Sequence, residues 1–141
     1  MQILPFQINL NLSFAIDLSL AVFLWLVQCI IYPSFRHISA DIFEKWHAGY
    51  QRRISWIIGP ILLLQLFLVC IEAVQVPSSY SLIRLGLVAV SWLITVCISV
   101  PLHCRIERGE EREQSIERLI QSNWLRTLTW SSLLLSHFLP W

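Results

Sequence analysis

Charged residues are scarce in this 141-residue chain, because Lys, Arg, Asp and Glu together make up 13% of it and 56% of it is hydrophobic. A soluble domain of this length usually carries more charge than this. The sequence also lacks internal repeats, glycine-rich phosphate loops, nucleophile-elbow motifs and any feature that supports a nucleic-acid partner. The composition therefore predicts a membrane protein with a single domain, residues 1–141.

Cysteine pairs with CxxC or CxxCH spacing are also absent, although the chain has four cysteines. Such spacings are typical of metal, redox or covalent haem sites. We therefore interpret the cysteines as small packing residues and predict no metal site. They are Cys29, Cys70, Cys97 and Cys104.

Long apolar segments are what the sequence has in abundance. About 20 apolar residues are needed to cross a hydrocarbon core of roughly 30 Å, and residues 12–32, 54–74 and 82–103 meet this length. Residues 124–141 form a shorter fourth segment. No Lys or Arg occurs in residues 1–16, so we expect a transmembrane helix there and not a cleaved signal peptide. The sequence predicts an all-α polytopic membrane protein, a four-transmembrane-helix bundle.

Basic residues are distributed unevenly between the predicted connections. Nine of the ten Lys and Arg residues lie in residues 33–53, in residues 104–123 or at Arg126, and Arg84 is the exception. Connections rich in Lys and Arg stay in the cytoplasm. We therefore predict a multi-pass protein of the bacterial cytoplasmic (inner) membrane with both termini outside and with Lys45 on the cytoplasmic side.

Polar residues follow one face of each predicted span, whereas a helix that contacts only lipid needs none. We expect these faces to turn inward and to hydrogen-bond across helices, because polar groups in hydrocarbon need partners. For the hydroxyls, a bond to the backbone of their own helix is the alternative. The residues are Ser13, Asp17 and Gln28, then Gln65 and Glu72, then Arg84, Ser91, Thr95 and Ser99, and finally Thr129, Ser132 and Ser136.

Three of these residues, Asp17, Glu72 and Arg84, are ionisable. An ionised side chain in a membrane costs several kcal/mol unless it is paired or hydrated. We therefore predict an intramembrane charge cluster in which Arg84 lies within salt-bridge reach of Asp17 or Glu72. A structural ion-pair cluster and a proton or cation path are both open interpretations.

Residues 40–52 have an amphipathic pattern, with Phe43, Trp46, Tyr50 and Ile54 at helical spacing. This pattern predicts an interfacial helix between the first and second spans. Prolines follow or interrupt the spans nearby. Pro33 is expected to end the first helix, Pro60 to kink the second and Pro101 to loosen the third just before His103.

The predicted topology brings aromatic, basic and histidine side chains to the cytoplasmic end of the bundle. Such a group suits a headgroup, quinone or porphyrin site, with the two histidines as acid–base groups or haem ligands and the arginines as anion clamps. Anchoring at the membrane interface is the alternative for each single residue. The predicted catalytic residues are His47, His103 and Asn123, and the predicted binding residues are Tyr50, Arg53, Trp56, Trp124 and Arg126.

The motifs "IIYPSF", "WHAGYQRRISWIIGP", "VPLH" and "NWLRTLTW" resemble, in this order and over nearly the whole chain, an uncharacterised family of small bacterial four-helix membrane proteins. Members of that family often have a second histidine where this chain has Tyr50 and a glutamate near Gln65. More distantly, the layout is similar to the anthrone-oxygenase-like membrane family. The first resemblance implies no established activity, and the second is an analogy of fold.

Two hypotheses for function remain open from the sequence. The first is an oxidoreductase or oxygenase-like enzyme that acts on a hydrophobic aromatic or quinone-like molecule, with haem or quinone as conceivable cofactors. The second is a non-catalytic assembly or interaction subunit whose partners are membrane helices or further copies of itself. A small transporter that uses Asp17, Glu72 and Arg84 is disfavoured, because no inverted repeat is visible.

Overall fold

The structure is a computed structural model that describes residues 3–139, with side chains from residue 11 onward. Over this range the chain is helical and contains no strand. In chain order the elements are α1 (Ile3–Leu26), η1 (Val27–Ile31), α2 (Tyr32–Ser34), η2 (Phe35–His37), α3 (Ala40–Gln75), α4 (Ser79–Ile94), η3 (Thr95–Ser99), α5 (Val100–Glu107) and α6 (Arg112–Ser136).

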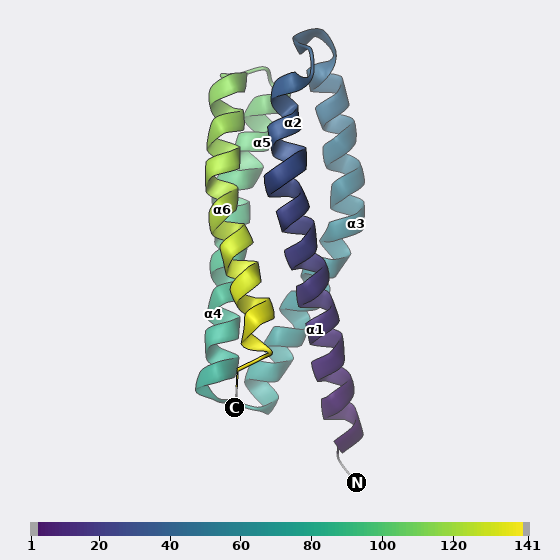
Figure 1. The fold of residues 1–141 in the computed structure, drawn as a ribbon, viewed down its shortest axis with the longest axis vertical. Coiled ribbons are helices and arrows are strands. Elements are labelled where there is room, and N and C mark those ends of the chain that lie inside the picture. The colour runs from purple at the N-terminus through teal and green to yellow at the C-terminus, as the bar shows by residue number, and fades with distance from the viewer. Residues whose placement is uncertain (1–2, 140–141) are drawn as a thin grey trace.

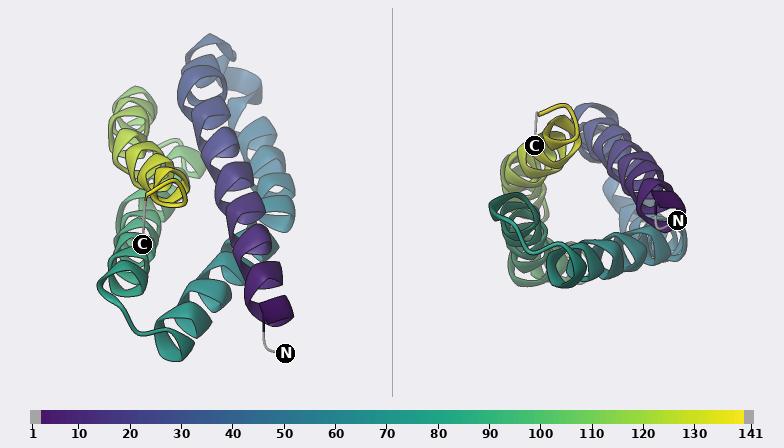
Figure 2. Two further views of the ribbon diagram at one scale, coloured as in Figure 1. Left: turned by 60° about the horizontal axis from the view of Figure 1, so that its bottom comes forward. Right: turned by 90° about the horizontal axis from the view of Figure 1, so that it is seen from below.

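The helices run side by side along the long axis of the molecule (Figure 1). Helices α3 and α6 each pack against α1, α4 and α5. The connections at residues 38–39 and 108–111 lie at one end, which we call the polar end. The connection at residues 76–78 and both ends of the described chain lie toward the opposite, distal end (Figures 1 and 2). This arrangement is the one expected if both termini lie on the same side of a membrane.

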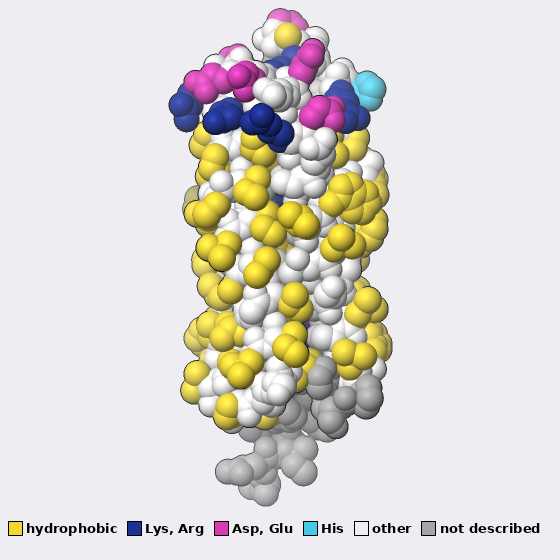
Figure 3. All heavy atoms as spheres, turned by 90° about the vertical axis from the view of Figure 1, so that its left-hand side faces the viewer, with side chains coloured by type: hydrophobic (Ala, Val, Ile, Leu, Met, Phe, Trp, Pro, Cys, Tyr) yellow, Lys and Arg dark blue, Asp and Glu magenta, His cyan; other side chains and the backbone are white. Residues whose placement is uncertain are grey.

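Three helical segments are long and apolar enough to cross a membrane: Asn11–His37, Ala40–Gln75 and Ser79–Glu107. Each contains one of the first three predicted spans, so the prediction of three helices long and apolar enough to cross a membrane is confirmed. The fourth predicted span, residues 124–141, covers the last part of α6 and residues outside the described range, and it is not confirmed. Figure 3 shows one face on which charged side chains gather at the polar end and hydrophobic side chains cover most of the remaining length.

The amphipathic segment 40–52 is not a separate interfacial helix. It forms the first part of α3, which runs without interruption for 36 residues, because no helix-breaking residue separates it from the predicted second span. At 1.5 Å per residue, α3 is roughly 54 Å long and exceeds the roughly 30 Å hydrocarbon core. Its two halves point in different directions (Figure 2), and Pro60 lies inside the helix, where it lacks a backbone donor.

A wide π-helical turn precedes each of two other prolines. The backbone N–H of Tyr32 bonds to the carbonyl of Val27 just before Pro33. The N–H of Val100 bonds in the same way to the carbonyl of Thr95 just before Pro101. The expectation that the first helix ends at Pro33 was wrong, because the wide turn adjusts the hydrogen-bond ladder to the proline and the helical path continues to residue 37. Both turns lie beside the site described below.

Two apolar clusters form the core. The first combines Ile16, Leu20, Leu24, Leu68, Val69, Val88, Trp130 and Leu133. The second, toward the polar end, combines Val27, Tyr32, Phe35, Phe43, Leu102, Ile106, Ile116 and Leu119. Along α6, the buried polar residues Asn123 and Thr127 lie between Leu119 of one cluster and Trp130 of the other.

Arg112 fixes the connection at the polar end. Its guanidinium donates to the carbonyls of Ile38 at 2.6 Å and Phe35 at 3.4 Å, and it lies 4.1 Å from the centre of the Phe43 ring. These contacts join the start of α6 to the turn between η2 and α3. They position the first turns of α3, which carry His47.

Candidate functional site

A chain of buried polar side chains crosses the interior at the polar end. The Tyr32 hydroxyl lies 3.1 Å from Nε2 of His103, and Nδ1 of His103 lies 3.0 Å from Nε2 of His47. On the far side, Nδ1 of His47 lies 3.8 Å from a carboxylate oxygen of the partly exposed Glu107. We call these four residues the relay. The structure thus brings together the two histidines that the sequence analysis singled out.

The relay has two self-consistent proton arrangements. A neutral imidazole has one N–H donor and one acceptor nitrogen. If the Tyr32 hydroxyl donates to His103, then His103 donates to His47 and the remaining His47 N–H faces Glu107. If every bond is reversed, His103 donates to the Tyr32 oxygen. Switching between the two arrangements would move one proton equivalent between Glu107 and Tyr32. The His47 Nδ1 has no hydrogen-bond partner in this structure, so the last step needs a closer approach of Glu107 or a bridging water.

Helical spacing and aromatic packing explain how the relay residues are positioned. His103 and Glu107 are four residues apart and share one face of α5, one turn beyond the π-helical turn η3. His47 is fully buried between Phe35 and Phe43, whose ring centres lie 5.4 and 5.5 Å from its own. This aromatic packing holds the imidazole of His47 in one orientation, which a hydrogen-bonded relay needs.

A cavity of about 180 Å³ adjoins the relay at Tyr32 and His103. It lies between α3 and the η3–α5 segment, and its lining includes Tyr50, Arg126 and several aliphatic side chains. Ser55 and Val100 also line it and are exposed on the outer surface. The cavity therefore opens sideways, toward the apolar exterior of the helices.

Three hydrogen-bond donors that line this cavity have no partner among the residues that the structure describes. They are the Arg126 Nε, the Ser99 hydroxyl and the Gln51 amide nitrogen. Buried polar atoms in native proteins are nearly always satisfied, so an unpaired group of this kind indicates a missing water or ligand. All three can donate, so a water, an anion or an electron-rich ligand oxygen would satisfy them.

Arg126 brings an uncompensated charge to the cavity. Its side chain is buried, yet no carboxylate of the described residues lies within ion-pair distance of it. It contacts neutral groups, namely the side-chain oxygen of Asn123 at 3.3 Å and the Trp130 ring at 5.8 Å from its centre. A buried cation without a counter-ion is costly, and an anion in the cavity would offset that cost.

Asn123 positions this arginine. Its amide nitrogen lies 2.9 Å from the Gln28 oxygen and 3.3 Å from the Thr127 hydroxyl, while its oxygen accepts from Arg126. Gln28 in turn donates to the carbonyl of Ile120. Asn123 was predicted as a catalytic residue, but it is not among the residues that line the cavity. The structure places it behind Arg126.

Three predicted binding residues lie outside this group. Trp56 is 78% exposed, Arg53 is exposed on the same helix, and Trp124 packs its edge against Trp25 on the outer surface. The reason is helical rotation, since nine residues turn Trp56 by about half a circle from His47 on α3. These three residues lie at about the same level along the bundle as the site, but their side chains point away from it.

Sequence reasoning missed Tyr32, Gln51 and Glu107 as members of the site. Each lies four residues after a polar residue that the sequence analysis had named: Gln28, His47 and His103, respectively. Positions four apart share a helix face. Extending each polar stripe by one turn would have identified all three.

The geometry does not fit haem ligation by the two histidines. Their rings are stacked with centres 5.1 Å apart and a ring nitrogen of each is used in their mutual hydrogen bond, so no porphyrin plane fits between them. The adjoining cavity of about 180 Å³ is also smaller than the roughly 300–1,000 Å³ of typical cofactor sites. Cys29, Cys70 and Cys97 are exposed and not packed as predicted, and over residues 3–139 no three His, Cys, Asp or Glu residues form a metal-binding group.

The predicted charge cluster lies toward the distal end of the molecule. Arg84 donates to Asp17 at 2.8 Å and to Glu72 at 3.2 Å, so the expected ion pairs are present. Gln65 donates to Asp17 at 2.6 Å, and Nε2 of His137 lies 2.8 Å from the same carboxylate. The sequence analysis did not expect His137 to join this cluster.

Comparisons with protein-family models, with curated proteins and with solved structures find no match to this chain.

Proposed function

We propose that this protein is an integral membrane enzyme that binds a hydrophobic molecule with one acidic hydroxyl or enolic oxygen and exchanges a proton with it. The observation that carries this proposal is the hydrogen-bonded path from His47 through His103 to Tyr32 at the wall of the cavity, with Glu107 3.8 Å beyond His47. General acid–base groups must lie within hydrogen-bond reach of the proton that they transfer. In this proposal Tyr32 and His103 do so at the cavity.

The size of the cavity and the pattern of its donors limit the class of molecule that it can bind. An apolar cavity of about 150 Å³ holds one benzene ring, and this cavity measures about 180 Å³. Arg126, Ser99 and Gln51 supply three unpaired donors to its lining. A phenol-like or quinol-like ring, or one such ring of a larger molecule that extends through the lateral opening, satisfies both requirements. This is the substrate class of an oxidoreductase or oxygenase-like enzyme acting on aromatic or quinone-like molecules.

The membrane setting belongs to the same proposal. We place the polar end in the cytoplasm of a bacterial cell and both termini outside, because the basic residues gather at the polar end. We assign α6 as the fourth span, since exposed leucines such as Leu125, Leu128 and Leu135 give it an apolar outer face. Cysteine-accessibility labelling tests this topology: position 45 is expected to be labelled only from the cytoplasm, and labelling from outside would contradict it.

Binding of 4-nitrophenol to the protein in mild detergent tests the cavity, because the absorbance of this single-ring probe distinguishes phenol from phenolate. We expect the wild-type protein to bind it with an increased phenolate fraction. Arg126→Leu is expected to abolish the increase, whereas Arg53→Leu, which removes an exposed arginine, is the matched control and should leave it unchanged. The proposal would be contradicted if both variants gave the same phenolate fraction of the probe as the wild type.

The non-catalytic alternative predicts a different result. An assembly subunit would copurify in stoichiometric amount with another membrane protein, and His47→Phe would not affect that association. Absence of probe binding together with such a partner would replace the enzyme proposal by the subunit hypothesis.

A further inference from the structure

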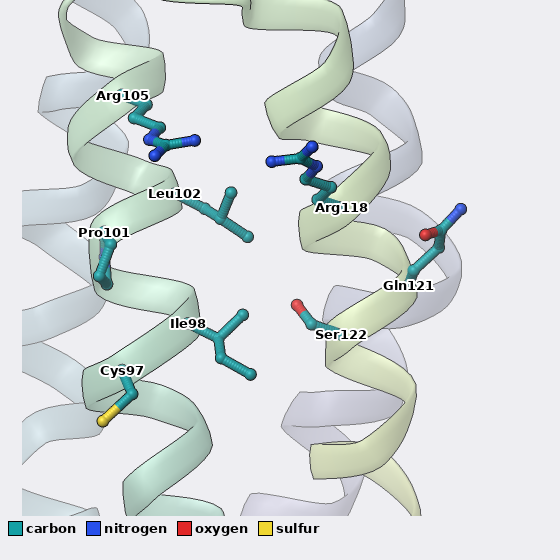
Figure 4. A pocket seen from close by; sticks show the side chains of 8 residues that line it. All are labelled: Cys97, Ile98, Pro101, Leu102, Arg105, Arg118, Gln121 and Ser122. Carbon is teal, nitrogen blue, oxygen red and sulfur yellow. The ribbon is translucent and has the colours of Figure 1, made fainter.

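A second hollow lies on the outer surface, in a groove of about 390 Å³ between the η3–α5 segment and α6. Figure 4 shows Arg105 and Arg118 facing each other across this groove from the two helices. Ile98 and Leu102 extend into the groove below them, and the Ser122 hydroxyl points into it from α6. The groove is thus cationic at its upper part and apolar further along. It is separate from the cavity at Arg126.

Arg105 and Arg118 lack the acidic partners that Arg36 and Arg108, at the same end of the molecule, have. Arg36 pairs with Glu117, and Arg108 pairs with Glu110. Over the described part of the chain, no carboxylate forms an ion pair with Arg105 or Arg118. With its amide turned, Gln114 accepts from Arg118 at 3.1 Å, but this partner is neutral. Two like charges that face each other repel, and an anion between them would remove the repulsion.

The position of the groove indicates what kind of anion it holds. It begins at the charged polar end and continues onto the apolar surface, where Cys97, Ile98 and Pro101 are exposed. We propose that this groove binds an anionic phospholipid. The phosphate lies between Arg105 and Arg118, and the start of an acyl chain lies along Ile98 and Leu102. The proposal requires α6 to lie in the bilayer, but it does not require the cavity to bind a ligand.

Lipid binding to the purified protein in neutral detergent tests the proposal, with the number of bound lipids counted by native mass spectrometry. The probes are a short-chain phosphatidylglycerol, a phosphatidylcholine of the same chain length and inorganic phosphate. We expect phosphatidylglycerol to bind best, because only it combines net negative charge with an acyl chain. Binding of inorganic phosphate as tight as that of phosphatidylglycerol would assign the groove to a free anion and overturn the lipid assignment.

The double variant R105Q/R118Q is the decisive test. Two arginines near a membrane surface together contribute about a 30-fold change in lipid affinity, and we expect a loss of that size for phosphatidylglycerol. The matched control R36Q/R108Q removes the same charge from the same end but from arginines that already have acidic partners, and it should keep wild-type affinity. Equal losses in the two double variants would show only general charge attraction and would overturn the proposal. If R105Q/R118Q still binds 4-nitrophenol, then the groove and the cavity at Arg126 are independent sites, and one proposal can be wrong without the other.

Discussion

Two buried arginines in this protein have opposite surroundings. Arg84, which is 1% exposed, contacts the carboxylates of Asp17 and Glu72, the Ser136 hydroxyl and the carbonyl of Leu133. Arg126, which is 7% exposed, contacts neutral groups among the described residues and has an unpaired Nε beside a cavity. Both arginines lie in the interior of a molecule whose face in Figure 3 is largely apolar below the polar end.

We interpret this difference as one between a charge that stabilises the fold and a charge that binds a ligand. The charge of Arg84 is already compensated, and its contacts join the four helices α1, α3, α4 and α6 without a ligand. The charge of Arg126 has no carboxylate partner among the described residues, and in our proposal an anion in the cavity compensates it. Uncompensated polar groups inside membrane proteins usually mark functional sites. The comparison therefore directs the functional proposal to the polar end, although the sequence draws attention equally to the Asp17, Glu72 and Arg84 cluster.

The largest expected effect comes from removing the compensation of Arg84. Asp17→Asn deletes the buried carboxylate but keeps its shape, and we expect a loss of about 3–5 kcal/mol in the free energy of unfolding. Glu72→Gln is the matched control. Its loss should be about 1 kcal/mol, because the Glu72 side chain is 18% exposed and better hydrated. Denaturant titration in detergent measures both, and equal losses would show that the cluster does not depend on burial.

The same substitution at each arginine tests the comparison directly. Arg84→Leu strands the buried Asp17 carboxylate and should cost about 3–5 kcal/mol in the free energy of unfolding. Arg126→Leu strands no carboxylate among the described residues, so we expect a change of about 1 kcal/mol or less, or a gain in stability. Thermal and denaturant unfolding of the two variants decide this. A large loss in Arg126→Leu would mean that its charge has a structural role.

Interrupting the relay should slow proton exchange without preventing binding. His47→Phe keeps an aromatic ring in the pocket formed by Phe35 and Phe43 but removes both nitrogens. After a pH jump, we expect bound 4-nitrophenol to change its ionisation about 100-fold more slowly than in the wild type. The exposed His37 provides the control, since His37→Phe should leave the rate unchanged. An unchanged rate in His47→Phe would exclude the relay as the proton path.

The smallest expected effect concerns one hydroxyl. Ser99→Ala removes an unpaired donor that lines the cavity, and it should weaken probe binding by about 1 kcal/mol, or about fivefold. Ser91 has a buried and unpaired hydroxyl of the same kind, but it is not among the residues that line the cavity. Ser91→Ala should therefore leave the affinity unchanged. Equal effects in the two titrations would mean that the hydroxyls act through general packing.

The sequence by itself determined the helical class, three segments long and apolar enough to cross a membrane, and the inward direction of several polar residues. Length and composition are enough for the spans, because the roughly 30 Å hydrocarbon core sets a minimum apolar run. Periodicity is enough for residues such as Asp17, Gln65 and Arg84, because polar groups that cannot face lipid must face the interior. The same reasoning brought His47 and His103 to one end of the molecule.

Only the tertiary structure decided which of these residues touch. The sequence placed Trp56, Trp124 and His47 at one depth, but helix rotation turned both tryptophans outward. Two π-helical turns before prolines set the direction of the residues that follow them, and local propensity does not predict such turns. Compensation of a buried charge depends on atoms contributed by several helices. For this reason the ion pairs of Arg84 and the unpaired state of Arg126 emerge only when the helices pack.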